Sequence, residues 1–313
     1  MAQPSETFDT YDSIGEREDL SDVIYNISPT DTPFLSSAAK TQATAVLHEW
    51  QTDSLAAAVT NNAVIEGDEA TADAVTATTR LSNSSQILDK VVTITGTQEA
   101  VDKAGRASEI AYQIAKKAKE LKRDLESSLT SNNAEVTGGS STARQLGGLG
   151  SWVATNDVFG GSGASGSLGN TARTNGTQRA FTEAQLKSVI KSVWNSGGNP
   201  QIIMVGPFNK QKLSGFTGNS TRFDAGADAT LYTSVDVYAS DFGQTQVIPN
   251  RFSRDRDAWV LDMDYWGVAF LRDFSMHELA KTGDTEKRQL LVECTLESRN
   301  EAASGLIADL TTS

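Results

Sequence analysis

One segment matches the glycine pattern of a nucleotide-binding loop. Residues 161–166 read Gly-Ser-Gly-Ala-Ser-Gly, which fits the GxGxxG fingerprint. In that fingerprint the pyrophosphate binds at the N-terminus of the helix that follows the loop. Residues 167–176 are instead rich in Gly, Asn, Ser and Thr, which indicates further turns and no helix. The chain also has no Gly-Lys dipeptide and hence no P-loop, so we expect no nucleotide and no other cofactor.

Four acidic residues in the C-terminal third could bind a cation or act as paired carboxylates. They are Asp255, Asp257, Asp262 and Asp264. A calcium loop of the EF-hand type also needs a loop glycine and a terminal Glu at fixed positions, and both are missing here. We therefore interpret the four as surface acids that flank strands, and we predict no metal site.

The remaining candidates for chemistry are few. The chain has two His residues, His48 and His277, and one Cys, Cys294. Two His without a matching Cys set do not make a familiar zinc site, and a single Cys cannot form an internal disulfide. We expect Cys294 to be a buried apolar residue. A Ser–His–Asp triad stays open because it is defined by geometry and not by spacing, but nothing favours one, so we predict no catalytic residue and no enzyme.

Composition limits the partners of this chain. Its 313 residues carry 27 Lys and Arg against 40 Asp and Glu, a formal charge of −13, so the molecule as a whole repels polyanions. The N-terminus is polar and acidic where a secretory signal would be basic and then apolar. The longest apolar run, Ile202 to Val205, is far shorter than a membrane-spanning helix. We expect a protein made in a reducing cytoplasm, with no membrane contact and no small-molecule substrate.

Two helices are predicted in the N-terminal half. Residues 1–40 form an acidic arm of net charge −6, in which Leu20, Val23, Ile24 and Ile27 have helical spacing. Apolar residues three and four apart also predict one long helix over residues 97–131, which would span about 50 Å and act as a strut. Its surface is basic, which indicates either a solvated face or a contact with acidic arms or DNA. The basic residues are Lys103, Arg106, Lys116, Lys117, Lys119, Lys122 and Arg123.

A long polar excursion separates the arm from the strut. We predict an outgoing strand over residues 45–52 and a returning strand over residues 86–95, with a polar tip at Asn61-Asn62 and Glu66-Gly-Asp-Glu69. An isolated hairpin this polar is marginal in water. It is therefore either a disordered insertion or a loop that docks on a neighbouring subunit.

The C-terminal half indicates an α/β layer. A glycine-rich joint at residues 138–176 precedes a helix that begins with the capping box Thr182–Gln185 and ends near Gly197, followed by a buried strand at residues 201–205. Residues 290–297 alternate between apolar and polar, which predicts a half-buried final strand. Further strands are predicted at residues 234–240, 245–248, 258–262 and 266–271.

The order of these elements resembles the major capsid proteins of tailed bacteriophages, which have the Hong Kong 97-type fold. Local sequence resembles that family too, in Asn26-Ile-Ser-Pro-Thr-Asp-Thr-Pro-Phe34, Leu47-His-Glu-Trp50, Met263-Asp-Tyr-Trp266 and Val292-Glu-Cys-Thr-Leu-Glu297. The similarity covers nearly the whole chain. It implies an α+β subunit with an N-terminal arm (1–43), an extended β-hairpin loop (44–95), a peripheral domain with a spine helix (96–180 and 271–313) and an axial domain (181–270).

The resemblance implies a shell subunit that forms pentamers and hexamers around double-stranded DNA. The expected partners are further copies of the chain, a portal protein at one vertex, DNA bound non-specifically and, because the arm lacks a coiled scaffolding segment, a separate scaffolding protein. The founding member crosslinks Lys to Asn, but Asn61, Asn62 and Lys90 do not match that chemistry, so we expect no crosslink. The expected inter-subunit contacts are Glu66, Asp68, Glu69, Arg80, Lys116, Lys119 and Arg123.

Three other classes compete with this interpretation. A bacterial nanocompartment shell shares the fold but encloses a cargo enzyme. A secreted adhesin or surface-layer protein would explain the Thr, Ala and Gly content but should carry an export signal. An enzyme with an unrecognised site would be a monomer with a deep pocket.

Overall fold

A computed structural model gives the arrangement of residues 31–70, 72–102, 107–216 and 236–313. The amphipathic helix that the sequence predicts within the acidic arm lies outside these described residues, as do Lys103 and Arg106. No helix within these ranges is both long enough and apolar enough to cross a bilayer.

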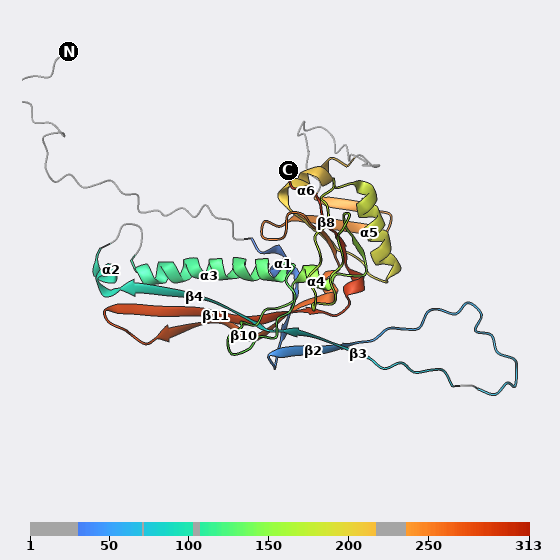
Figure 1. Cartoon of the computed structure of the whole chain (residues 1–313), viewed down its shortest axis with the longest axis horizontal. Coiled ribbons are helices and arrows are strands. Elements are labelled where there is room, and N and C mark those ends of the chain that lie inside the picture. Colours follow the sequence, from blue (N-terminus) through green and yellow to red (C-terminus); the bar gives the residue numbers. More distant parts are fainter. Residues whose placement is uncertain (1–30, 71, 103–106, 217–235) are drawn as a thin grey trace, which may run out of the picture.

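The molecule consists of an elongated platform, a compact lobe at one end of it and a loop that projects beyond (Figure 1). The platform is a four-stranded sheet of order β1-β10-β11-β4, in which β1 is parallel to β10 and the other pairs are antiparallel. A long helix, α3, lies on one face of this sheet. The elements are α1 (Pro33–Ser37), β1 (Ala39–Gln42), β4 (Gln86–Thr95), α2 (Gly96–Ala100), α3 (Glu109–Leu129), β10 (Trp266–Leu279) and β11 (Thr285–Ser298).

The lobe is built on a six-stranded sheet of order β5-β12-β9-β6-β8-β7. Helix α5 and helix α6 cover it (Figure 1). Its elements are α4 (Leu149–Trp152), β5 (Asp157–Val158), α5 (Glu183–Asn195), β6 (Ile202–Val205), α6 (Pro207–Ser214), β7 (Val237–Ser240), β8 (Gly243–Pro249), β9 (Ala258–Leu261), β12 (Gly305–Ile307) and the short 3-10 turns η1 (Met263–Tyr265) and η2 (Glu301–Ala303).

The central strands of the lobe sheet, β6 and β9, have apolar side chains on both faces, and one of these faces packs against the platform. Ile203 and Val260 point into a core with α5, whereas Met204 and Trp259 point into a second core that also contains α3 and the platform sheet. Successive side chains of a strand point to opposite faces, so these two-sided apolar strands require cover on both sides. The lobe and the platform therefore share one of the two apolar cores.

The strut helix is shorter than the sequence predicts. A single helix over residues 97–131 is wrong, because α2 ends at Ala100, the next residue Val101 is extended, and α3 begins only after Ser108. The Ser108 hydroxyl accepts a hydrogen bond from the Ala111 amide and caps α3. The 21 residues of α3 span about 32 Å. The predicted apolar face is confirmed in the C-terminal part of α3, where Leu121, Leu125 and Leu129 are fully buried against the sheet, whereas Ala111 near its start is exposed.

The strand at residues 86–95 exists, but its predicted pairing is wrong. It is β4, and it pairs with β11 in the platform, whereas the outgoing strand β2 (Leu47–Thr52) pairs with β3 (Thr79–Ser84). The apolar residues Leu88, Val92 and Ile94 lie on the same face as Lys90, at alternate positions of the strand, and are buried under α3. The polar hairpin could not have covered this face, so β4 joins the sheet that α3 shields.

The lobe and the last strand follow the sequence more closely. The capping box of Thr182 and Gln185 starts α5, and Gly197 follows its end with φ +85°. The predicted half-buried last strand is wrong in one respect, because residues 291–298 of β11 are all buried. The β2–β3 hairpin covers the face that alternation would have left open. Cys294, on the α3 side of β11, is fully buried as predicted, and burial raises the pKa of its thiol to about 12.

Candidate assembly surfaces

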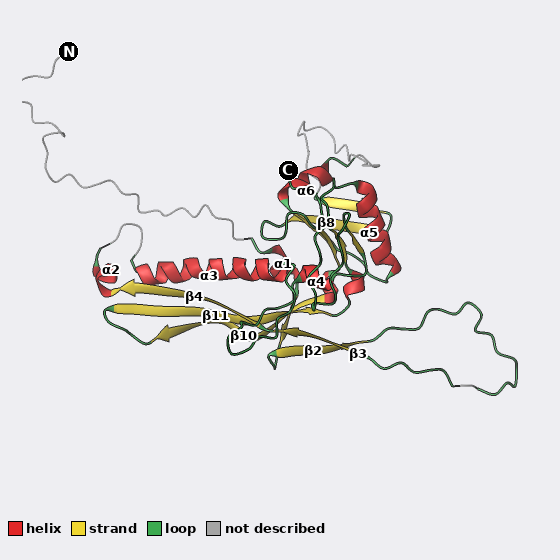
Figure 2. Cartoon of the chain, in the orientation of Figure 1, coloured by secondary structure: helices red, strands yellow, loops and turns green. Residues whose placement is uncertain are grey.

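The projecting loop, residues 53–78 without the undescribed residue 71, is the most exposed part of the described chain. It forms no helix or strand (Figure 2). Its apolar side chains face solvent, with Leu55 99%, Val75 96% and Val64 82% exposed. A turn at the tip is closed by a hydrogen bond from the Asp68 amide to the Ile65 carbonyl. Apolar side chains exposed to this degree indicate a surface that another molecule covers.

All charged residues of the loop are acids. The predicted contact residues Glu66, Asp68 and Glu69 all lie exposed at or beside the tip turn. With Asp53 and Asp73 they make five acids between residues 53 and 78, and the same segment has no Lys or Arg. Its partner surface should therefore combine apolar and cationic groups.

The root of the loop is fixed to the body of the protein. Trp50 of β2 donates its Nε1 hydrogen to the Ser298 carbonyl at 2.7 Å and packs on Trp152, with ring centroids 5.4 Å apart. The buried Asn83 amide of β3 donates to the Leu296 carbonyl at 2.8 Å and accepts from the Gly147 amide at 2.8 Å. Arg80 pairs with Glu49 across the hairpin at 3.4 Å and is 69% exposed. The loop therefore projects from a rigid base.

A charged cluster locks the hairpin onto β11. Glu297 accepts hydrogen bonds from Arg299 and Thr41, each at 3.0 Å, and its Oε2 lies 3.4 Å from His48 Nε2. The hydrogen bond from His48, with those from Arg299 and Thr41, lowers the pKa of Glu297 from 4.5 to about 2. Burial opposes this shift without cancelling it. The cluster therefore holds the carboxylate ionised.

This cluster predicts a pH-dependent stability. Because the folded pKa of Glu297 is depressed, its contribution is present above the ordinary range near 4.5 and is lost as pH falls through about 2. Glu297→Gln should lower the free energy of unfolding at pH 7 by about 1–3 kcal/mol. In urea titrations the difference from the parent should shrink between about pH 5 and pH 2. The control Glu278→Gln removes a carboxylate that is 56% exposed and should change little. A difference for Glu297→Gln that does not vary with pH would contradict the assignment.

The basic residues that were predicted as contacts on α3 differ in their exposure and in the contacts that they already make. Lys116 and Lys119 are exposed. Lys117 is engaged with Glu120 one turn along the helix at 2.7 Å. Arg123 is half-buried, and its guanidinium lies over the Phe252 ring of the lobe at 5.3 Å. Lys116 and Lys119 are thus available to a partner, whereas Arg123 already contacts its own chain.

A second surface, which the sequence did not indicate, lies on the face of the platform sheet opposite α3. Ile87 and Val91 of β4 are each 46% exposed there, while the intervening Leu88 is buried under α3. Directly paired residues share a face of the sheet. Ile87 pairs with Glu293, which in turn pairs with Arg272, and Thr93 pairs with Lys287. This sheet face therefore carries the apolar Ile87 and Val91, the exposed acid Asp89 between them, and two cations, of which Arg272 is already paired with Glu293 at 2.7 Å and Lys287 lies opposite Thr93. The only sequence signal was that residues 87 and 91 are apolar as well as residues 88 and 92.

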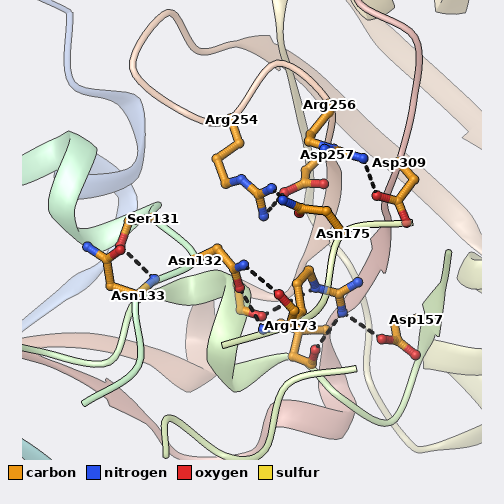
Figure 3. A network of polar contacts seen from close by, with 12 residues as sticks. Ser131, Asn132, Asn133, Asp157, Arg173, Asn175, Arg254, Arg256, Asp257 and Asp309 are labelled. Carbon is orange, nitrogen blue, oxygen red and sulfur yellow. Dashed lines mark hydrogen bonds and ion pairs between the residues drawn. The ribbon is translucent and has the colours of Figure 1, made fainter. Parts of the chain in front are cut away.

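A polar network joins the end of α3, the glycine-rich joint and the lobe (Figure 3). Arg173 binds Asp157 at 2.6 Å, and Asn132 exchanges two 2.9 Å hydrogen bonds with the Arg173 backbone. Arg256 binds Asp309 at 2.6 Å. Buried ion pairs of this kind define geometry more than they add stability, because desolvation offsets their attraction. The network is thus a structural joint between the platform and the lobe.

The sequence indicated that all four acids of the C-terminal third lie on the surface, and this interpretation is wrong for two of them. Asp255 and Asp264 are exposed, but Asp257 and Asp262 are buried. Asp257 pairs with Arg254 at 3.0 Å, and Asp262 accepts from the Asn199 amide at 2.9 Å. Burial raises the pKa of Asp257, while Arg254 opposes that rise. Each of the two buried acids therefore has a partner within the lobe and serves a structural role.

The other motifs show no arrangement for catalysis. No helix follows the glycine pattern at residues 161–166, and the preceding Gly160 amide donates to Asp309 at 3.0 Å. His277 is exposed, and its described hydrogen bond is to Ser275. Within the described ranges, no group of three or more His, Cys, Asp or Glu is placed to hold a metal ion.

The platform with its spine helix, the compact lobe and the projecting hairpin define the shell-forming subunits of the Hong Kong 97-type fold. The chain belongs to the SU10 major capsid protein family, whose model matches residues 3–311. It is 30% identical to the major capsid protein of Escherichia phage Phieco32, over 98% of this chain and 97% of that protein. The resemblance to phage major capsid proteins is confirmed: this is a structural component of the virion head shell and not an enzyme.

Solved structures show the same fold at low identity. The capsid of cyanophage A-1(L) superposes with a TM-score of 0.68 at 12% identity, covering 97% of this chain and 98% of that chain. The capsid of a native GTA particle gives 0.62 at 13% identity over 95% and 96%. The SrpI encapsulin of Synechococcus elongatus PCC 7942 gives 0.56 at 14% identity over 96% and 94%. The encapsulin shares the fold, and the family match separates this chain from the nanocompartment alternative.

Proposed function

We propose that this chain assembles into pentamers and hexamers that close an icosahedral shell around the double-stranded DNA of a tailed phage. In this proposal the arm spans residues 1–43, the extended loop 44–95, the peripheral domain 96–180 with 271–313, and the axial domain 181–270. The observation that carries it is the loop, whose almost fully exposed apolar side chains project from a rigid base. Such a surface is stable only when a neighbouring molecule covers it.

The landing site of the loop is the neighbour's sheet face opposite α3. The β2–β3 hairpin lies on that side of its own sheet, so the loop leaves the subunit at the level of this face (Figure 1). The apolar side chains of the loop would contact Ile87 and Val91 of the neighbour. The acidic tip of the loop would lie near Lys287 of the neighbour. Burying an exposed aliphatic side chain contributes about 1.5–3 kcal/mol. Each single contact is weak, but every subunit is held at several edges at once, which makes a closed shell stable.

The α3 side of the platform would then face the interior. Lys116 and Lys119 give it a local positive charge in a molecule of net charge −13. Such a surface contacts DNA without sequence preference, while the overall acidity keeps the attraction weak during packaging. A separate scaffolding protein would guide assembly and a portal protein would occupy one vertex. The contacts would be Glu66, Asp68, Glu69, Arg80, Lys116, Lys119 and Arg123.

Expression in bacteria with and without the other structural genes of the same source tests this function. Sedimentation and negative-stain electron microscopy should show uniform polyhedral shells, and mature particles should contain nuclease-protected DNA. A monomer or a small ring in every combination would overturn the proposal. Shells that contain protein but no DNA would also overturn the proposal.

The basic face of α3 makes a separate prediction about DNA. Wild-type subunit should bind a labelled duplex weakly in fluorescence anisotropy. The pair Lys116→Glu and Lys119→Glu should reduce the slope of log affinity against log salt by about 2. The control pair Lys191→Glu and Lys281→Glu makes the same charge change at exposed positions elsewhere and should leave the slope unchanged. Tight binding that falls steeply with salt in both variants would sink the assignment of this face.

A further inference from the structure

A groove of about 560 Å³ lies on the α3 side of the platform, between α1, α3 and the two strands β1 and β10. Phe270 and Phe274 line it together with two cations, Lys40 and Lys122, and one acid, Asp273. The Lys122 ammonium lies 5.9 Å from the centroid of the Phe274 ring. The groove therefore offers aromatic surface beside positive charge.

The apolar floor continues along a free strand edge. Strand β1 pairs with β10 only at residues 267–270, and no other strand in the described ranges pairs with the outer edge of residues 271–279. Met276 pairs with Leu290, which pairs with Lys90, and Lys90 binds Asp124 of α3 at 2.6 Å. Met276 therefore lies on the α3 side, and it is 50% exposed. An open edge with apolar side chains calls for a cover.

The point where residues 1–30 join the fold is fixed beside this groove. Thr32 lines it. The next residues are held by the fully buried Glu126 of α3, whose carboxylate accepts from the Phe34 and Leu35 amides, each at 2.8 Å. Asn250 of the lobe donates to the same carboxylate at 2.7 Å. The chain that precedes residue 32 therefore starts at the groove.

The sequence of that segment complements the groove. Residues 1–30 contain seven acids and a single basic residue, Arg17. Within them Leu20, Val23, Ile24 and Ile27 have the i, i+3, i+4, i+7 spacing of one helix face. The eight residue steps from position 24 to position 32 reach about 12 Å as a helix and about 28 Å when extended, enough to bring the apolar positions over the floor.

We propose that, in the unassembled subunit, residues 20–27 of the same chain lie in this groove. Their apolar face covers Phe270, Phe274 and Met276, and Asp22, the one acid among them, approaches Lys40 and Lys122. The contact keeps an apolar strand edge covered before neighbours are present. It goes beyond shell formation, because it is a property of the free subunit.

Disulfide trapping in the full-length chain tests this contact. The chain with Ile24→Cys and Met276→Cys is oxidised at low concentration, and the monomer fraction is separated without reductant. The control joins Ile24→Cys to Val91→Cys, which is exposed to a similar degree on the opposite face of the sheet. Cys294 adds no background because it is buried and its raised pKa leaves little thiolate. The Met276 pair should form at least about tenfold more intrachain disulfide than the control, because a docked tethered segment has a high effective concentration.

Charge reversal gives the second test. Adding Lys40→Glu and Lys122→Glu, which reverse the two cations that line the groove, to the Met276 pair should bring its intrachain disulfide down toward the control level. Equal yields for the Met276 and Val91 pairs would overturn the contact. Disulfides that link separate chains and not one chain would overturn its assignment to the same subunit. Shell formation is measured separately, so failure here leaves the proposed function intact.

Discussion

A chain whose projecting loop is shortened should fold but form no shells. Replacing residues 54–77 with a short Gly-Ser turn leaves the β2–β3 pairing intact, because Thr52 and Thr79 are the last paired residues. The change removes the exposed apolar surface of the loop and its acidic tip together. Assembled material in sedimentation should fall at least about tenfold, because a closed shell multiplies the loss at every repeated contact. Circular dichroism and the urea midpoint of the subunit should stay close to those of the parent.

Point substitutions separate loop chemistry from loop length. Leu55→Ser, Ile65→Ser and Val75→Ser together remove apolar surface without shortening the chain, and they should also depress assembly. The control pair Val46→Ser and Val237→Ser alters residues that are 42% and 54% exposed outside the loop. It should assemble more fully than the triple variant. Normal shells from both the shortened and the triple variant would show that the loop is not an assembly element.

Trp152→Ala should cause the largest loss of stability among single substitutions considered for this chain. Trp152 is fully buried, donates to the Gly147 carbonyl at 3.2 Å and packs on Trp50. Truncating a buried Trp leaves a cavity and typically costs about 3–5 kcal/mol. The loss should appear in urea titrations as a lower midpoint. Because Trp152 also supports the root of the loop, the variant should assemble poorly as well.

The matched control is Trp194→Ala in α5. Trp194 is 54% exposed and packs beside Phe242 on the surface of the lobe. Its removal should cost less than about 1.5 kcal/mol, since most of its surface is already hydrated. If the two variants lost similar stability, the central role given to Trp152 would be wrong.

Local signals in the sequence were enough for many elements. The capping box at Thr182 and the glycine at residue 197 bound α5 correctly, because caps and αL residues act within a few positions of the chain. The apolar spacing of Leu121, Leu125 and Leu129 gave the buried face of α3. The order of elements and short sequence strings indicated the capsid family, which the comparisons confirm.

Other features depend on contacts between distant residues, which spacing does not encode. The strand at residues 86–95 pairs with β11, about two hundred residues later, and not with the strand that precedes it. Asp257 is buried and pairs with Arg254, three residues before it, but their spacing does not show that Arg254 also binds Asn175 of the distant glycine-rich joint. For the same reason the sequence did not show that Ile87 and Val91 lie half-exposed on the face of the sheet opposite α3.

A cryo-electron microscopy map of the assembled shell tests the central claim most directly, because it shows where residues 53–78 lie. We predict density for this loop across the adjacent subunit, on the face of the β4–β11–β10 sheet opposite α3, with the acidic tip near Lys287 of that neighbour. A loop folded over its own subunit, or one that extends into solvent without touching a neighbour, would contradict the account.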